Sequence, residues 1–537
     1  MKSKLAILGL LAVVLAAAGV IAVGSYAGAH FGRSAYALYL YGSGLQKQNA
    51  GDFRGAIADY DAALKLDPQL SKVYHNRGVA KASLGRWTDA IADYDRCLQI
   101  DPQSATTYYS RGLAEGWLKD WKGALADYDR ALKLDDKKAN AYYARGQAKG
   151  CLNDVDGGIA DYNRALALNP NYPDAWYGRA ILKDARGDHD GAIADYNRAL
   201  EIAPKFAKAW WGRAAAKEWK RDWAGAIADD TSALRYDPRL AMAYDSRGLA
   251  HWYQGNLEAA LADYNSALAL NARLPDPWYH RGLIKAKRKD WAGAIADYDE
   301  TLKLNPRQTT AYSERGQAKF SAGNFDGAMA DQTTALEADP KYANAWRRRA
   351  VMKIYLGDLE GASADCERTI QIDPRFGRAY LDRADVECLR RDWSRALQDF
   401  RRWHDLSTGD QGLARLSIWV MRARAGDRTG ADQELSSWLD AQSMEKAARW
   451  EAKQASFLVG RISEEEFLAN LGSAEANGGA EDRCRALYFV GMKKLLDGDK
   501  SGAAEGFRKC LATGEKTRMS YLYAQAELKV LGEKDGE

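Results

Sequence analysis

The sequence predicts an all-α fold: a solenoid of antiparallel helix pairs. Three observations predict this fold. A 34-residue repeat recurs eleven times without a gap from residue 37 to about residue 410, most regularly in residues 173–206. Within each repeat, small and apolar residues follow helical spacing in two segments. Proline near the end of most repeats ends the second segment.

We number the repeat from 1 to 34, with Pro173 at position 1. Position 8 is always Gly or Ala, and position 20 is Ala except at Gly158, so the two helix backbones can approach closely. Aromatic residues at positions 4, 17 and 24 are expected to fill the space around that contact. A turn such as Arg186-Gly187-Asp188 separates the helices. One pair cannot bury its apolar face alone, so neighbouring pairs are expected to stack into one continuous core.

The repeat resembles the tetratricopeptide repeat (TPR), whose period and residue pattern it matches over residues 37–410. The resemblance implies a right-handed superhelix of antiparallel helix pairs. It also implies a protein-binding role, with ligands in a concave groove that the first helices line.

Residues 1–36 form a separate N-terminal segment. Lys2 and Lys4 precede an apolar run over residues 5–23, whose length is close to the ~20 residues that span a bilayer. Ala27-Gly28-Ala29 could be a signal-peptide cleavage site, so the run is either an uncleaved anchor or a cleaved signal. In both cases the lysines should stay in the cytoplasm, which places the repeats outside it.

The pattern blurs beyond residue 410. Residues 411–483 are interpreted as degenerate TPR-like helices and a linker, and residues 484–537 as a terminal repeat, a capping helix and a tail. The last part is similar to the C-terminal part of TPR lipoproteins of the bacterial envelope at Tyr488-Phe489-Val490-Gly491, Gly498-Asp499 and Phe507. Those proteins are adaptors that hold peptidoglycan hydrolases and a periplasmic protease. The chain lacks their lipobox, so specific partners are not transferred.

Composition excludes several classes of function. Lys and Arg number 77 against 73 Asp and Glu, a net charge of +4, which argues against a nucleic-acid binder. The histidines form no catalytic triad or metal motif, no P-loop occurs, and the cysteines lack metal-ligand spacing. We therefore predict no enzyme activity, no metal and no cofactor.

Two charges recur in step with the repeat. Position 23 is Asp in all eleven repeats and position 7 is Arg in ten, while position 11 is often Lys. The expected arrangement is a structural Arg–Asp ladder between the second helix of one repeat and the first helix of the next, because buried charges need partners. The alternative is a stripe that binds carboxylates or phosphates. The central members of the ladder are Arg77, Arg111, Arg145, Arg179, Arg213, Asp93, Asp127, Asp161, Asp195 and Asp229.

Aromatic residues also gather at the positions that face a TPR groove, which are positions 2, 5, 9, 12 and 13. We expect them to bind an extended peptide or a partner helix, since aromatic anchors dominate interface energetics. The alternative is that these rings pack on the next repeat. The candidates are Tyr109, Trp117, Tyr143, Tyr177, Trp211, Trp219, Trp252, Tyr253, Tyr279, Phe320 and Tyr355.

Cys484 and Cys510 occupy positions 1 and 27 of the terminal repeat, where the two ends of an antiparallel pair lie side by side. We expect a disulfide there, provided that the compartment is oxidising. The alternative is two buried thiols.

Taken in order, these features predict a non-catalytic scaffold or adaptor at the bacterial cell envelope, either anchored facing the periplasm or released there. The alternative is an auxiliary factor in export or assembly of envelope polysaccharide or protein.

Overall fold

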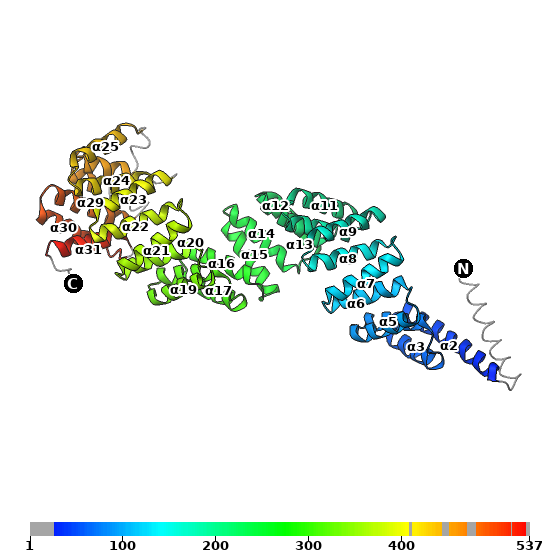
Figure 1. The fold of residues 1–537 in the computed structure, drawn as a ribbon. Helices are drawn as coiled ribbons and strands as arrows, with labels where there is room; N and C mark the ends of the chain where they lie inside the picture. Colours follow the sequence, from blue (N-terminus) through cyan, green and yellow to red (C-terminus); the bar gives the residue numbers. More distant parts are fainter. Residues whose placement is uncertain (1–25, 408–410, 443–449, 470–478, 517, 533–537) are drawn as a thin grey trace. The chain divides into compact units, whose positions relative to one another are not determined.

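The structure, a computed structural model, describes residues 26–407, 411–442, 450–469, 479–516 and 518–532. These residues form 29 α-helices and no strand. The chain divides into two compact halves, Met1–Ala272 and Arg273–Glu537 (Figure 1), each of which is described by itself.

The N-terminal half contains seven antiparallel helix pairs among its described residues, each pair stacked on the next. Its helices are α2 (Tyr26–Asn49), α3 (Phe53–Leu66), α4 (Ser71–Ser83), α5 (Trp87–Ile100), α6 (Ala105–Trp117), α7 (Trp121–Leu134), α8 (Ala139–Cys151), α9 (Val155–Leu168), α10 (Pro173–Ala185), α11 (His189–Ile202), α12 (Ala207–Trp219), α13 (Trp223–Tyr236), α14 (Ala241–Tyr253) and α15 (Leu257–Leu270).

The C-terminal half continues the same pattern through α23 and then departs from it. Its helices are α16 (Pro275–Lys287), α17 (Trp291–Leu304), α18 (Thr309–Ser321), α19 (Phe325–Ala338), α20 (Ala343–Tyr355), α21 (Leu359–Ile372), α22 (Gly377–Arg390), α23 (Trp393–Leu406), α24 (Gln411–Arg424), α25 (Arg428–Asp440), α27 (Trp450–Leu458), α28 (Glu464–Ala469), α29 (Gly479–Leu496), α30 (Lys500–Leu511) and α31 (Met519–Val530).

The predicted two-helix repeat is confirmed, with α10 over positions 1–13 and α11 over positions 17–30. The second helix begins because the carboxylate of Asp188 accepts a hydrogen bond from the backbone N–H of Gly191 at 3.0 Å, an N-cap. The turn before it needs a left-handed residue, which Gly187 provides with φ +85°. The C-cap residue before proline is extended, as proline requires; Asp67 has φ −139° and ψ 97°.

The predicted close approach of the two helices is also present. In the second repeat, a Cβ on Gly78 would lie 2.6 Å from the ring of Tyr94, so the glycine lets this ring lie directly against the first helix. Tyr94 is 2% exposed. Position 24 is Tyr in seven of the eleven repeats, where the core contains one tyrosine of the second helix beside a small residue of the first.

The apolar run over residues 5–23 lies outside the described residues. Within the described ranges, no helix is both long enough and apolar enough to cross a membrane. The first helix, α2, begins at Tyr26 and so starts ahead of position 1 of the first repeat.

The last described helix, α31, contacts a regular repeat in addition to the terminal helix pair. α31 packs on α29 and α30, and it also lies against α22, the first helix of the eleventh repeat. Met519 and Leu522 of α31 join Ile354 and Val386 in one hydrophobic cluster. The end of the chain therefore covers the face on which positions 5, 9 and 12 of the last regular repeat lie.

Candidate partner-binding groove

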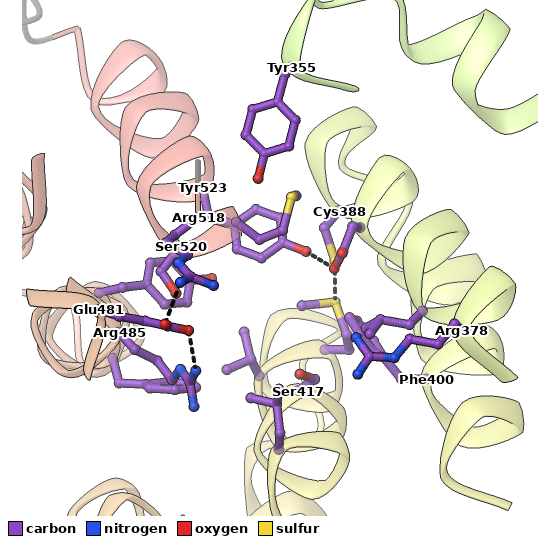
Figure 2. A pocket seen from close by; sticks show the side chains of 18 residues that line it. Tyr355, Arg378, Cys388, Phe400, Ser417, Glu481, Arg485, Arg518, Ser520 and Tyr523 are labelled. Carbon is purple, nitrogen blue, oxygen red and sulfur yellow. Dashed lines mark hydrogen bonds and ion pairs between the residues drawn. The ribbon is translucent and has the colours of Figure 1, made fainter. Parts of the chain in front are cut away.

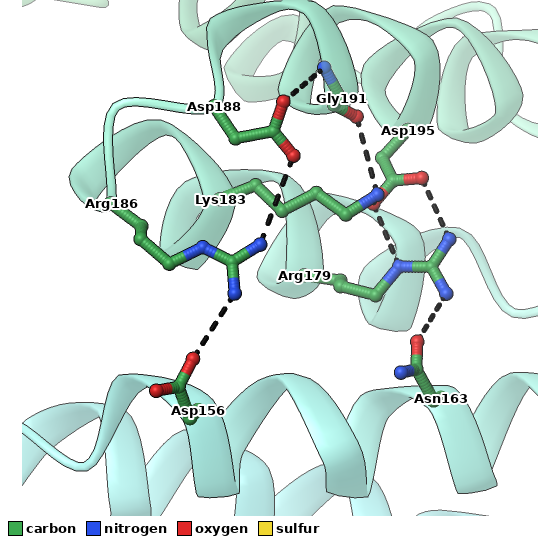
Figure 3. Close-up of polar contacts among 8 residues, drawn as sticks. All are labelled: Asp156, Asn163, Arg179, Lys183, Arg186, Asp188, Gly191 and Asp195. Carbon is green, nitrogen blue, oxygen red and sulfur yellow. Dashed lines mark hydrogen bonds and ion pairs between the residues drawn. The ribbon is translucent and has the colours of Figure 1, made fainter.

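The Arg–Asp pairs lie inside one repeat, whereas the expected ladder joined neighbouring repeats. Arg179 donates from Nε and Nη2 to the two carboxylate oxygens of Asp195, both at 2.7 Å (Figure 3). Positions 7 and 23 meet because both lie eight residues from position 15 of the turn, so they stand side by side in an antiparallel pair. The same bidentate geometry joins Arg77 to Asp93, Arg111 to Asp127, Arg145 to Asp161 and Arg213 to Asp229.

A link between repeats does exist, through the remaining guanidinium nitrogen. Nη1 of Arg179 donates to the side-chain oxygen of Asn163, at position 25 of the preceding repeat, at 2.5 Å (Figure 3). In the other members the acceptor is Asp61, Asp95, Asp129 or Asn197. The arginine thus ties its own helix pair together and fastens it to the pair before.

The carboxylate at position 23 is fully engaged as well. Lys183 contacts Asp195 at 2.8 Å and donates to the backbone oxygen of Gly191 at 3.4 Å. The Arg179 guanidinium carbon also lies 4.6 Å from the centre of the Trp176 ring at position 4. With its donors and one face used internally, this arginine favours the structural ladder over the stripe that binds carboxylates or phosphates.

Three repeats lack the lysine at position 11, where they have Glu115, His251 and Glu387, and sequence analysis did not single them out. Glu115 holds position 11 where Lys is usual, so it faces Asp127 with the same charge. Burial, with a smaller contribution from Asp127, raises the pKa of Glu115 to about 7. Its Oε2 is buried and has no hydrogen-bond partner within the described residues. In the third repeat, two carboxyl groups of like charge therefore lie side by side, where most repeats have a lysine beside the aspartate.

Three of the predicted groove residues, all at position 13, are the most exposed. Trp117 is 69% exposed, Trp219 73% and Tyr253 58%. Each stacks one face on the position-17 ring of the preceding repeat: Trp117 on Trp87, Trp219 on His189 and Tyr253 on Trp223, with centroids 5.2, 5.6 and 4.2 Å apart. One face of each ring packs on the preceding repeat, whereas the alternative interpretation expected the next one. The other face is open to solvent, and partner binding by these rings stays a prediction.

The position-5 tyrosines are more deeply set. Tyr109, Tyr143, Tyr177 and Tyr279 lie tilted against the position-24 tyrosine of their own repeat, with centroids 5.8–6.0 Å apart. Burial raises the pKa of Tyr177. These rings form the floor of the groove and present only part of their surface to a partner.

The other four candidates divide between groove and core. Trp211 and Trp252 are half-buried, and Tyr355 is half-buried with its ring 5.3 Å from Phe320. The prediction that Phe320 faces a partner in the groove is wrong, because its side chain is 8% exposed and packs among Phe325, Tyr355 and Met352. Both Trp252 and Phe320 hold position 12, but only the Phe320 ring lies in the core between neighbouring helix pairs.

The open rings border two equivalent hollows in the N-terminal half. One, of about 580 Å³, lies between α10 and α12 and is lined by Tyr177, Ile181, His189, Trp211 and Trp219. The other, of about 250 Å³, lies between α4 and α6 and is lined by Val79, Trp87, Leu113 and Trp117. We call these two hollows and the exposed rings beside them the aromatic groove.

Cys484 and Cys510 lie close together, as their positions in the terminal repeat predicted. Both are buried thiols in the structure, with their sulfurs 3.0 Å apart. Their mutual hydrogen bond lowers the pKa of Cys484 and raises that of Cys510. The contact makes a disulfide sterically accessible, and the bond itself stays a prediction.

A metal centre finds no support in the described ranges. They contain no group of three or more His, Cys, Asp or Glu residues arranged to hold a metal ion.

The comparisons with known proteins identify the repeat. The family model described as "Tetratricopeptide repeat" matches residues 41–105, 152–207, 279–343 and 313–375, and one described as "TPR repeat" matches residues 252–288. No curated protein matches the chain. The matched segments end at residue 375, so they do not reach residues 484–537, and the expected resemblance of that part to envelope lipoproteins is not confirmed.

Several solved structures are similar over part of the chain. MamA is 29% identical, covers 31% of this chain and 96% of its own, and has a TM-score of 0.29. A tetratricopeptide repeat protein from Parabacteroides merdae is 22% identical over 46% of this chain and 98% of its own, with a TM-score of 0.39. Yeast Tom70 is 16% identical over 76% of this chain and 99% of its own, with a TM-score of 0.35. These scores are low, so they carry no argument here, and the family models are the finding: they match tetratricopeptide repeats in segments of both halves of the chain.

Proposed function

We propose that the chain is a non-catalytic adaptor that binds an extended segment of a protein partner along the aromatic groove of its N-terminal half. The observation that carries this proposal is the solvent-facing side of Trp219, which is 73% exposed beside a hollow of about 580 Å³. A large ring already held on one face loses little freedom on binding, and such rings are frequent anchors of interfaces.

An extended segment suits the geometry better than a compact surface. The two hollows share most of their lining positions, namely 9, 12, 13, 17 and 24 of one repeat and 6, 9 and 13 of the next. They lie between successive first helices, so they offer separate sites for spaced side chains. Their walls combine rings with aliphatic residues such as Ile181, which is 42% exposed. Apolar and aromatic side chains of the partner would enter these hollows while its backbone stays in solvent.

The location is part of the proposal and is supported by the sequence alone. Residues 5–23 form an apolar run behind Lys2 and Lys4, which favours insertion with the repeats outside the cytoplasm. The adaptor would then act at the bacterial envelope, where the similar TPR lipoproteins act. A reporter that is active only in the cytoplasm, fused after Glu537, is expected to be silent; strong activity would contradict this location.

Site-directed crosslinking tests the binding role. A photo-crosslinking phenylalanine derivative in place of Ile181 should capture a defined partner, because this position lines the larger hollow. The same residue in place of Arg198, whose side chain is 54% exposed on the second helix, is the matched control.

Three outcomes are informative. Capture at position 181 that is lost with Trp219→Ala supports the groove. Equal capture at position 198 would show that the adduct is non-specific. Capture at position 181 that persists with Trp219→Ala would contradict the role of this ring.

A further inference from the structure

The C-terminal half encloses a cavity that the repeat pattern does not predict. It measures about 280 Å³ and lies among α22, α24, α29 and α31 (Figure 2). Its α22 wall consists of Arg378, Leu381, Asp385 and Cys388, which hold positions 2, 5, 9 and 12 of the eleventh repeat. These are groove positions, so the cavity is the end of the repeat groove covered over by the last helices.

Specific contacts hold that cover in place. The hydroxyl of Tyr523 on α31 donates to Oδ1 of Asp385 on α22 at 2.5 Å. Glu527 of α31 pairs with Arg391 at 2.7 Å and with Arg424 at 2.5 Å. The walls therefore come from segments far apart in the sequence, joined by a charged cluster at one end.

The cavity carries an excess of positive charge. Arg485 and Arg518 both pair with the carboxylate of Glu481, at 3.3 and 2.5 Å (Figure 2), and Arg518 also lies 3.9 Å from a carboxylate oxygen of Glu515, outside the cavity. Arg378 lies on the opposite wall and is exposed, while Asp382 on the same helix is bonded to Arg347 at 3.1 Å. Three guanidinium groups thus line the cavity, and Glu481 and Asp385 are the carboxyl groups among its lining residues.

The remaining carboxyl does not cancel this charge. Asp385 is 7% exposed, and burial raises its pKa to about 8, so it is mostly protonated at neutral pH. Apolar side chains complete the lining: Leu413, Val420, Met421 and Phe489. The site therefore combines guanidinium donors with an apolar wall.

We propose that this cavity binds a small organic acid, with its anionic group between Arg378 and the Arg485–Arg518 pair and its apolar body against α24 and α29. Guanidinium groups are strong donors to carboxylates. The volume lies just below the ~300–1,000 Å³ of typical ligand sites, which fits a short aliphatic or aromatic monocarboxylate. A cation would meet three like charges, and a purely apolar ligand would make no use of the guanidinium donors. This site is separate from the aromatic groove and does not depend on the proposed adaptor role.

The position of the cavity gives binding a structural consequence. A ligand that touches both α22 and α31 binds only when these helices are packed together, so it stabilises the folded C-terminal half. Ligand binding should therefore raise the temperature at which the full chain begins to unfold.

Calorimetric titration of the full chain with four matched probes tests the proposal. Octanoate has both features, octanamide lacks the charge, octylamine reverses it and acetate lacks the apolar body. We expect octanoate to bind about tenfold more tightly than octanamide, in keeping with the strength of charged hydrogen bonds. Octylamine and acetate should give no measurable binding. A chain that does not bind octanoate, or that binds octylamine equally well, overturns the proposal.

Variants locate the binding. Arg378→Gln with Arg518→Gln should weaken octanoate binding by about tenfold or more without unfolding the chain, since both side chains reach solvent. Ser417→Trp should fill the cavity and abolish binding. Arg395→Gln, at a side chain 71% exposed outside the cavity, is the matched control and should change nothing. If the double variant keeps its helicity and still binds octanoate as the wild type does, the ligand binds elsewhere.

Discussion

The guanidinium of Arg213 holds both oxygens of Asp229 within a single repeat, at 2.8 Å from Nε and 2.7 Å from Nη2. The side chain of Asp229 is 4% exposed and that of Arg213 is 16% exposed. Ten of the eleven repeats have such an Arg–Asp pair between their two helices, and the first repeat has Ser43 in place of the arginine.

Arg213→Ala should lower the free energy of unfolding by about 2 kcal/mol. Removing one member of a buried pair costs about 3–5 kcal/mol when the other charge is left alone, but here Lys217 still contacts Asp229 at 2.7 Å. The double variant with Lys217→Ala should therefore cost distinctly more. Denaturant unfolding measures both, with Arg198→Ala as the exposed control. An unchanged midpoint for Arg213→Ala would mean that the pair does not stabilise the repeat.

Glu115→Lys should stabilise the chain at pH 8, because it restores the usual cation beside Asp127. The pKa of Glu115 is raised from 4.5 to about 7, so the folded state holds a proton that the unfolded state releases. Its contribution to stability is present below about pH 4.5 and is lost as the pH rises toward 7. The gain from the variant should be about 1–2 kcal/mol at pH 8, after allowance for partial exposure, and smaller at pH 5.

The neighbouring repeat supplies the control for this effect. Lys149→Glu exchanges the lysine that contacts Asp161 at 2.8 Å and should create the same pH-dependent loss in the fourth repeat. Urea titrations at pH 5 and pH 8 test both variants. Parallel pH profiles for wild type and Glu115→Lys would show that Glu115 titrates normally.

Trp219→Ala should leave helicity and stability nearly unchanged, within about 0.5 kcal/mol, because the ring is 73% exposed. Phe320→Ala should cost about 3 kcal/mol or more, because that ring is 8% exposed in the core. Circular dichroism with thermal melting compares them. The triple variant Trp211→Ala, Trp219→Ala and Trp252→Ala should lose more stability than Trp219→Ala, since the other two rings are half-buried. Equal melting curves for Trp219→Ala and Phe320→Ala would contradict this division.

Cys484 and Cys510 are expected to form a disulfide in extracytoplasmic protein. Their sulfurs are already 3.0 Å apart, and the bond would close a loop between residues 26 apart in the sequence. On the chain-entropy model such a loop stabilises the terminal helix pair by about 3 kcal/mol. Mass spectrometry of peptides digested without reduction should recover the linked pair, while Cys366, also buried, stays a free thiol. Recovery of both cysteines as thiols would refute the bond.

The candidate groove could be predicted only in part, and individual rings show why. Position alone identified Trp117 and Trp219 as groove residues, because position 13 ends the first helix and these two rings face outward from it. Position alone misplaced Phe320, because whether a ring at position 12 turns outward or inward depends on the space left by the neighbouring repeat. The partner of each Arg at position 7 was also misplaced, although the equal distance of positions 7 and 23 from the turn would have identified it.

The sequence by itself determined the repeat, its two helices, their turn and the positions that carry its paired charges and its small core residues. These features depend on contacts between residues fewer than 34 positions apart, and their residue pattern occurs eleven times in the sequence. Only the tertiary structure decided how the chain ends. Tyr523 contacts Asp385 across 138 residues, and α31 covers the groove of the eleventh repeat. That contact occurs once, and α31 does not belong to the 34-residue repeat, so the repeat pattern in the sequence does not predict it.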